Sequence, residues 1–449
     1  HRVTAGPTES AALAVNNGCD LNCGSVFLNL VEAVKRGLIS EETINKAITR
    51  LFIARFRLGM FDPPEMVAYA RIPYTVNDCQ KHRTLALQTA RESIVLLKNE
   101  NNLLPLRKGL KAIAVIGPNA DSLGVLLGNY NGIPSKYVTP LEGIRNKVSR
   151  DTEVFYTPGC DLTQRLSRGF SEAVSMAEKS DVVIMVLGIS PRLEGEEGEG
   201  EGDRTSIDLP AIQQELLEAV HATGKPIALV LTSGSPLAVN WAAERVPAII
   251  EAWYPGEEGG SAIADVLFGD YNPAGRLPIT FVKSLDQLPP FTDYNMKGRT
   301  YRYMEETPLF PFGYGLSYTT FRYSNLRMSR GQVSAGGNVG VYVDVENTGK
   351  YDGDEVVQLY VSHPDAPQTV PIRSLQGFTR IHLRKGEKKT VRFILTPQQY
   401  AIVNEEGKLI AEPGNVIVSV GGGQPNVRAG SSNVLTGSFK VVGQATEIE

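Results

Sequence analysis

Five short apolar runs occur between residues 83 and 284, and each one ends at a glycine or a proline. They read KAIAVIGP, EVFYTPG, DVVIMVLG, PIALVLTSG and AIIEAWYPG. Residues 170–179 and 211–222 between the runs have helical periodicity, and 83–99 before them is also predicted to be helical. Strands that are apolar on both faces and alternate with helices indicate a largely parallel sheet covered by helices. We therefore predict an α/β sandwich domain over 83–284.

The segments before this domain differ from it. Residues 1–62 contain helical stretches and almost no strands, and Ser40 followed by Thr43 is a weak capping box at the start of the longest one. Helices without partners make a poor core at this length. We therefore expect 1–62 to be the end of a larger domain, and 63–82, which contains prolines, to be a linker.

The segments after the α/β domain have a third character. Residues 285–324 are rich in proline, glycine and tyrosine without clear periodicity, which predicts a long connecting segment. Residues 325–449 alternate apolar and polar positions, as in NVGVYVDVENTG and KKTVRFILT. Such alternation with turn residues between the runs predicts an antiparallel β-sandwich. The chain is thus expected to be multidomain, α/β followed by β.

Composition excludes several classes of function. The formal net charge of −4 argues against a general nucleic-acid binder and against binding to a membrane surface. No apolar stretch reaches the roughly 18–20 residues that span a bilayer. The four cysteines form no disulfide framework or paired zinc pattern, and the five histidines are scattered. We expect no metal and no organic cofactor.

Several motifs together resemble glycoside hydrolase family 3. They are EAWYPGEEGGSAIADVLFGDYNPAGRLPITF, GRTYRYM with PLFPFGYGLSYTTF, and VENTGKYDGDEVVQLYV. The segments GNYNGIPSKYVTPLEGI and GCDLNCG are most similar to its β-xylosidase and α-arabinofuranosidase branch. The resemblance implies a (β/α)8 barrel, an α/β sandwich and a fibronectin type III-like domain. It also implies that 1–62 are the last helices of the barrel.

The same resemblance implies that part of the active site is absent from this chain. The family's nucleophile, an Asp on a late barrel strand, would precede His1. We therefore expect a companion chain or segment to carry the rest of the barrel. The expected partner is an oligosaccharide, and the sequence leaves room for a homodimer. The compartment is left open, with a secreted or periplasmic location favoured.

An acidic loop follows the run DVVIMVLG. Residues 194–201 contain five glutamates interleaved with glycine. A retaining glycosidase needs two carboxyl groups about 5–5.5 Å apart, one as nucleophile and one as acid/base. The resemblance places the acid/base on this loop, commonly as the second Glu of an ExE pattern before DR. Counted forward from Gly188, that position is Glu196, with Glu194 and Glu197 as the next candidates.

Counting backward from Asp203 and Arg204 instead favours Glu199 or Glu201. We prefer the forward count because the strand anchors it, whereas a glycine-rich loop accommodates an insertion easily. The non-catalytic alternative is a solvated acidic loop, which is the ordinary interpretation of such a composition outside this family pattern.

Four further residues are candidates for roles near the site. Arg204 is predicted to hold the loop by pairing with its carboxylates, or else to contact substrate. Trp253 and Tyr254 are predicted to pack in the core or between domains. The resemblance implies that Cys23 borders the sugar site, where a disulfide to a Cys beside the missing nucleophile would favour a pentose. The alternative for Cys23 is a buried, unpaired thiol.

These observations favour a retaining exo-glycosidase that removes terminal β-D-xylosyl residues from xylo-oligosaccharides. The alternatives are a β-glucosidase or α-L-arabinofuranosidase of the same family, and a non-catalytic carbohydrate-binding or scaffold fragment. Exposed apolar helices in 1–62 would be an aggregation liability for a free-standing fragment, which argues against the last alternative.

Overall fold

The computed structural model describes residues 3–195, 204–425 and 434–448. The chain divides into two units, His1–Cys79 and Gln80–Glu449. The boundary between them falls within the segment 63–82. Among the described residues, no helix combines the length and apolar character needed to cross a bilayer.

The first unit is a small helical cluster. Its helices are α1 (Pro7–Asn16), α2 (Leu30–Lys35) and α3 (Glu41–Arg57), with the 3₁₀ turns Val26–Asn29, Pro64–Met66, Ala68–Arg71 and Tyr74–Val76. The expected cap of α3 forms, because the Thr43 amide donates to Ser40 Oγ at 3.1 Å. The core is small and consists of three buried alanines, Val15 and Ile39. Large apolar side chains such as Leu28 and Phe56 remain mostly exposed.

The second unit begins with a six-stranded sheet. Its strands are β1 (Val95–Asn99), β2 (Ala112–Ile116), β3 (Glu153–Thr157), β4 (Val182–Gly188), β5 (Ile227–Thr232) and β6 (Ala248–Glu251). They lie in the order β1-β6-β5-β4-β2-β3, and all neighbours except β1 and β6 are parallel. All five predicted apolar runs are strands, and the prediction of a largely parallel sheet is confirmed.

The prediction of a helix over 83–99 was wrong in its second half. Helix α4 (Gln80–Ser93) ends where an apolar run begins, and Val95–Asn99 is strand β1, antiparallel to β6. The sequence IVLL suits a helix or a strand. The open edge of β6 supplies the hydrogen-bond partners that decide for the strand.

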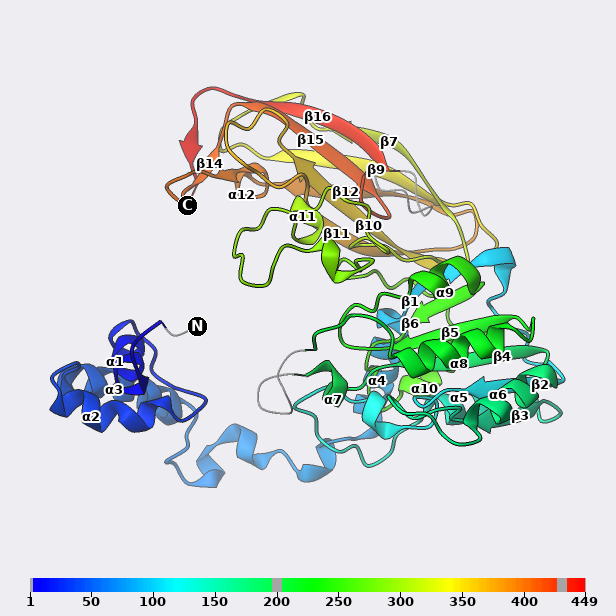
Figure 1. The fold of residues 1–449 in the computed structure, drawn as a ribbon. Coiled ribbons are helices and arrows are strands. Elements are labelled where there is room, and N and C mark those ends of the chain that lie inside the picture. The colour runs from blue at the N-terminus through cyan, green and yellow to red at the C-terminus, as the bar shows by residue number, and fades with distance from the viewer. Residues whose placement is uncertain (1–2, 196–203, 426–433, 449) are drawn as a thin grey trace. The chain divides into compact units, whose positions relative to one another are not determined.

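Helices cover both faces of the sheet (Figure 1). On one face α4, α5 (Pro140–Lys147) and α10 (Gly259–Leu267) pack into one core. On the other face α6 (Gly169–Glu178), α8 (Ala211–His221) and α9 (Asn240–Arg245) pack into a second core. A sheet buried on both faces needs apolar side chains in both directions, which explains the continuous apolar strands.

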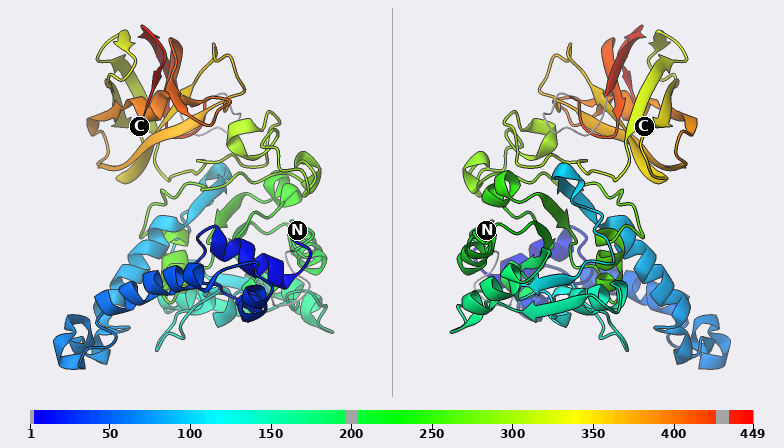
Figure 2. Two further views of the ribbon diagram at one scale, coloured as in Figure 1. Left: turned by 90° about the vertical axis from the view of Figure 1, so that its left-hand side faces the viewer. Right: turned by 90° about the vertical axis from the view of Figure 1, so that its right-hand side faces the viewer.

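The C-terminal part is a β-sandwich with two facing sheets (Figure 2). One sheet has the order β11-β10-β15-β16-β8 and the other β12-β9-β7. These strands are β7 (Phe321–Met328), β8 (Gln332–Ser334), β9 (Val339–Asn347), β10 (Gly353–Ser362), β11 (Ser374–Leu383), β12 (Lys388–Leu395), β15 (Gly414–Gly421) and β16 (Leu435–Val442). Inward side chains of both sheets share one core, as the alternating sequence predicts.

Short elements complete the second unit. They are the 3₁₀ turns Glu100–Asn102, Leu123–Val125 and Leu285–Gln287, helices α7 (Pro191–Glu194), α11 (Thr300–Tyr303) and α12 (Pro397–Tyr400), and a small sheet of β13 (Ile402–Val403), β14 (Leu409–Ala411) and β17 (Thr446–Glu447). The connecting segment that precedes the sandwich has little regular structure, as predicted.

The buried carboxylate of Asp344 in the β-sandwich should make the stability of the fold sensitive to acid. Asp344 accepts hydrogen bonds from Thr390 Oγ1 at 2.7 Å and Asn325 Nδ2 at 2.8 Å, and Lys388 Nζ lies 3.0 Å away. These contacts, the Thr390 hydroxyl foremost, hold the pKa of Asp344 well below its usual 3.8. The lowered pKa stabilises the fold above pH 3.8, and this contribution is lost as the pH falls through the lowered pKa.

We therefore expect Asp344→Asn to flatten the loss of thermal stability on acidification. Melting midpoints of both proteins, measured from about pH 5 to about pH 2.5, should converge as the pH falls. The exposed Asp151→Asn is the matched control and should follow the parent protein. A constant difference between Asp344→Asn and the parent across this range would contradict the assignment.

Candidate active site

The candidate site lies where the parallel strands β4, β5 and β6 end side by side at one edge of the sheet. Sites gather at this edge in α/β folds. The end of β4 is held closely: Gln213 accepts a hydrogen bond from the Gly188 amide at 2.8 Å and donates to the Gly188 carbonyl at 2.7 Å. Gly188 has a φ of +140°, and a Cβ there would meet the Thr232 carbonyl oxygen at 2.1 Å. The acidic loop therefore leaves the sheet from a constrained point.

Glu194 closes the short helix α7 and is bound by three donors. Its Oε2 accepts hydrogen bonds from Tyr254 Oη at 2.5 Å and from the Gly234 amide at 3.0 Å. The Ser235 hydroxyl contacts Oε1. Gly234 and Ser235 follow β5, and Tyr254 follows β6, so one carboxylate ties together the ends of three neighbouring strands.

Arg204 completes this network from the far end of the acidic loop. Its amide donates to the Glu194 carbonyl at 3.3 Å, which brings the two ends of the loop together. Its Nη2 donates to Ser235 Oγ at 2.9 Å and also contacts the Pro236 carbonyl. Burial lowers the pKa of Arg204, while the nearby Glu194 acts in the opposite direction.

A second carboxyl group lies beneath this network. Glu251, at the end of β6, is fully buried, and its Oε1 accepts the Trp253 amide at 3.0 Å. Burial is the main cause that raises its pKa well above 4.5, and the Glu194 carboxylate adds to it. The pKa of Tyr254 is raised by burial and then by its hydrogen bond to Glu194. Burial and the hydrogen bond to Glu194 both favour a protonated Tyr254 hydroxyl, which donates to Glu194.

The sequence-predicted residues are placed as follows. Glu194 and Arg204 come together in the network above. Glu196 and Glu197 lie outside the described residues, as do the alternatives Glu199 and Glu201. Among the described residues Arg204 contacts the Ser235 hydroxyl and the Pro236 carbonyl. Its predicted pairing with carboxylates of the loop stays a prediction.

Two interpretations need correction. Cys23, in the loop after α1, is an exposed free thiol, so the alternative of a buried cysteine was wrong. Trp253 does pack and donates through Nε1 to the Ser93 carbonyl at 3.0 Å. Tyr254, predicted only to pack, is a donor to Glu194. The signal that could have identified it is its position three residues after the apolar run AIIE, where the sequence already indicates the end of a strand.

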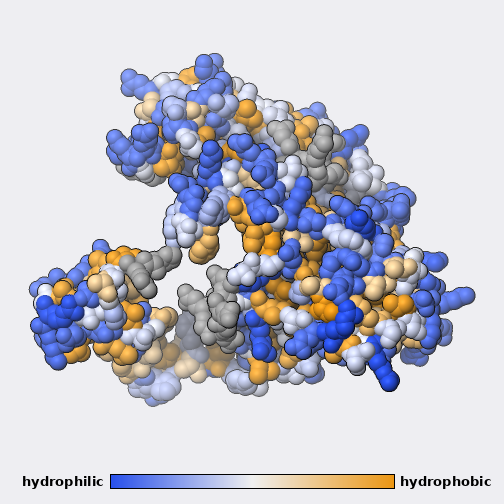
Figure 3. All heavy atoms as spheres, in the orientation of Figure 1, coloured by the Kyte–Doolittle hydropathy of each residue, from blue (hydrophilic) through white to orange (hydrophobic). Residues whose placement is uncertain are grey.

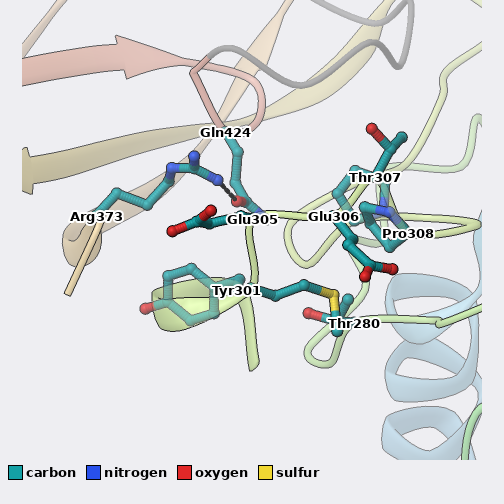
Figure 4. A pocket seen from close by; sticks show the side chains of 10 residues that line it. Thr280, Tyr301, Glu305, Glu306, Thr307, Pro308, Arg373 and Gln424 are labelled. Atoms are coloured by element: carbon teal, nitrogen blue, oxygen red, sulfur yellow. Dashed lines mark hydrogen bonds between the residues drawn. The ribbon is translucent and has the colours of Figure 1, made fainter. Parts of the chain in front are cut away.

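A small polar pocket lies beyond this site, between the connecting segment and the β-sandwich (Figure 4). Its volume is about 60 Å³, room for only a few waters. Arg373 Nη1 donates to Gln424 Oε1 at 2.8 Å across it, and Glu305 and Glu306 line it. It is too small for a sugar. The described residues contain no group of three or more metal-ligating side chains.

Comparison with known proteins decides the family. The Glycosyl hydrolase family 3 C-terminal domain matches residues 94–318, half of the chain, and these include Glu194, Arg204 and Tyr254. The chain belongs to glycoside hydrolase family 3. A Fibronectin type III-like domain matches residues 355–424 within the β-sandwich.

Some relatives in family 3 are named β-xylosidase and others β-glucosidase. The chain is 40% identical to a β-xylosidase of Formosa agariphila, over 91% of this chain and 58% of that protein. It is 35% identical to a periplasmic β-glucosidase of Salmonella typhimurium, over 91% of this chain and 58% of that protein. A solved β-glucosidase of Erythrobacter marinus superposes with a TM-score of 0.86 at 36% identity, over 98% of this chain and 61% of that one. The chain thus spans about three fifths of the length of these family 3 proteins.

The network predicts a cost of removing the Glu194 carboxylate. In Glu194→Ala, the Gly234 amide and the hydroxyls of Ser235 and Tyr254 lose their acceptor. The exposed Gly234 amide can bond to water instead, whereas the Ser235 and Tyr254 hydroxyls are partly buried. An unsatisfied buried donor costs about 1–3 kcal/mol, so we expect a clear fall in the thermal unfolding midpoint. The exposed Glu178→Ala, at the end of α6, is the control and should stay within about 0.5 kcal/mol of the parent. Equal melting of both variants would contradict the network.

Proposed function

We propose that this chain carries the acid/base part of a retaining exo-glycosidase that removes terminal β-D-xylosyl residues from xylo-oligosaccharides. The observation that carries the proposal is the anchored base of the acidic loop, in a family 3 chain 40% identical to a β-xylosidase. The other half of the site, including the nucleophilic Asp, is proposed to come from a barrel portion on a companion chain or segment.

Glu196 is proposed as the acid/base residue. In the first step the nucleophilic Asp attacks the anomeric carbon, and Glu196 gives its proton to the leaving oxygen as the glycosidic bond breaks. In the second step Glu196 takes a proton from water, which attacks the anomeric carbon and releases the Asp. Glu194 and Glu197 are the next candidates. The contacts of Glu194 support a positioning role, because its two oxygens already accept three donors.

The exposed apolar residues of the first unit support the missing barrel portion. Leu28 and Val31, which are three residues apart, and Phe56 of α3 are each more than 60% exposed. Large exposed apolar faces on helices ordinarily pack against another element. We propose that residues of the companion portion cover them.

The test combines composition with activity. The protein is isolated from its source, examined on a denaturing gel, and assayed with nitrophenyl β-xyloside, β-glucoside and α-arabinofuranoside. We expect a companion of about barrel size, roughly 250 residues, and the highest kcat/KM on the β-xyloside. A homogeneous 48.8 kDa protein without glycosidase activity would contradict the proposal.

The β-glucosidase alternative is favoured by one observation, the names of the Salmonella typhimurium and Erythrobacter marinus relatives. A higher kcat/KM on the β-glucoside in the same assay would support it. A preference for the α-arabinofuranoside would support the third specificity, and a glycan that binds without being hydrolysed would support the non-catalytic alternative.

A further inference from the structure

A large cavity lies next to the Glu194 network and shares Arg204 and Ser235 with it. Its volume is about 710 Å³, within the roughly 300–1,000 Å³ of small-molecule sites. Its walls come from the connecting segment, from residues 278–282 before it, from the loop after β5, and from Arg204 and Ile207. Most of the lining is apolar, and the ring of Phe312 stacks on Tyr301 with centroids 4.1 Å apart. Figure 3 shows hydrophobic residues on the exposed surface of this part of the molecule.

The described residues that line this cavity carry positive charge only. They include Arg204, Arg299 and Arg302, and no Asp or Glu is among them. Arg299 donates to the carbonyls of Pro290 and Asp293, and Arg302 Nε contacts Tyr301 Oη at 3.4 Å. Within residues 3–195, 204–425 and 434–448, none of the three arginines forms an ion pair with a carboxylate. Glu194 and Asp293 act on Arg204 and Arg299 only through longer-range electrostatics. Among the described residues, three guanidinium groups beside apolar walls therefore have no directly paired anion.

We propose that this cavity binds an aromatic carboxylate. The apolar walls and the Tyr301–Phe312 pair suit a flat ring, which stacks well on aromatic side chains. Arginine suits a carboxylate because its planar fork donates two parallel hydrogen bonds. The occupant is thus a small molecule or substituent that carries a ring and a negative charge together.

The position of the cavity gives this binding a place in the reaction. Arg204 and Ser235 belong both to the cavity lining and to the contacts at the base of the acidic loop. A residue of that loop that protonates the leaving oxygen must lie on the same side of the site as the leaving group. The cavity would then receive a leaving group that bears an aromatic acid. This last step rests on the proposed function, whereas binding of the aromatic carboxylate does not.

Calorimetric titration tests the binding. The probes are cinnamate and its neutral counterpart cinnamamide, titrated into the 449-residue chain. Cinnamate should bind saturably, and cinnamamide about tenfold more weakly or worse, the size of one charge-assisted hydrogen bond. Arg302→Gln should weaken cinnamate by a similar factor, Arg302→Lys by less, and Met296→Trp should block the cavity. Arg302 and Met296 are exposed enough for these variants to fold. Arg150→Gln, an exposed arginine elsewhere, is the control and should bind as the parent does.

Three outcomes would overturn the inference. They are no saturable heat with cinnamate, equal affinity for cinnamate and cinnamamide, or unchanged affinity in both Arg302→Gln and Met296→Trp. A second measurement separates this inference from the proposed function. In the isolated holoenzyme, a carboxylated aryl β-xyloside should be hydrolysed with a lower KM than the uncharged aryl β-xyloside. Cinnamate binding without any glycosidase activity would retain the inference and remove the proposed function, and glycosidase activity without cinnamate binding would do the reverse.

Discussion

Replacing Glu196 by alanine should reduce kcat by about 10²–10⁴-fold on a xylo-oligosaccharide, the usual contribution of a general acid/base. The loss should be far smaller for cleavage of a glycoside with an activated leaving group such as dinitrophenolate, because that oxygen departs without a proton. Azide should restore turnover of the activated substrate as a β-xylosyl azide product, because an anionic nucleophile attacks the intermediate without a base. Steady-state kinetics of the isolated enzyme with both substrates, with and without azide, make the measurement.

The neighbouring glutamates are the controls for this result. Glu199→Ala and Glu201→Ala should keep the dependence of the parent enzyme on the leaving group. Glu194→Gln retains a hydrogen-bonding side chain of the same size and should show no azide rescue, because a positioning residue removes no proton from water. Azide rescue in Glu199→Ala or Glu201→Ala, with normal behaviour of Glu196→Ala, would establish the backward count. Rescue in Glu194→Ala alone would make Glu194 the acid/base.

Replacing Glu355 by alanine should destabilise the second unit by about 3–5 kcal/mol, the usual cost of breaking a buried ion pair on one side. Glu355 lies on β10 and accepts from Arg276 Nη2 at 2.8 Å and from Tyr323 Oη at 2.6 Å. The side chains of Glu355 and Arg276 are only 2% and 10% exposed. The substitution would leave the Arg276 cation and the Tyr323 hydroxyl buried without this acceptor. Urea titration of the parent and the variant gives the change in the free energy of unfolding.

The Arg276–Glu355 pair also joins two parts of the unit, because Arg276 precedes the connecting segment whereas Glu355 belongs to the β-sandwich. The exposed ion pair between Arg322 and Glu346 is the matched control. Glu346→Ala should cost at most about 1 kcal/mol. Combining Arg276→Met with Glu355→Leu should recover most of the loss, because no buried charge then remains. A Glu355→Ala variant as stable as Glu346→Ala would show that the pair contributes little.

Predictions from the sequence were correct for elements that depend on neighbouring residues, and they failed where residues far apart in the chain decide the conformation. The runs from KAIAVIGP to AIIEAWYPG predicted five strands correctly, because burial on both faces leaves a continuous apolar signal within each run. The cap at Ser40 was equally local. Val95–Asn99 was misassigned because the edge of β6, about 150 residues away in sequence, decides its conformation.

The candidate site shows the same division. The sequence by itself determined the family resemblance and the acidic loop after β4, and it singled out Glu194 and Arg204, because motif and strand-end position are written in consecutive residues. Only the tertiary structure decided that Glu194 faces Gly234, Ser235 and Tyr254, and that Tyr254 is a donor as well as a packing residue. These partners follow β5 and β6, which come next to β4 in the sheet order, and they lie 40 to 60 residues from Glu194 in the chain. Their meeting depends on how parallel strands align their carboxyl ends, which no single stretch of sequence encodes.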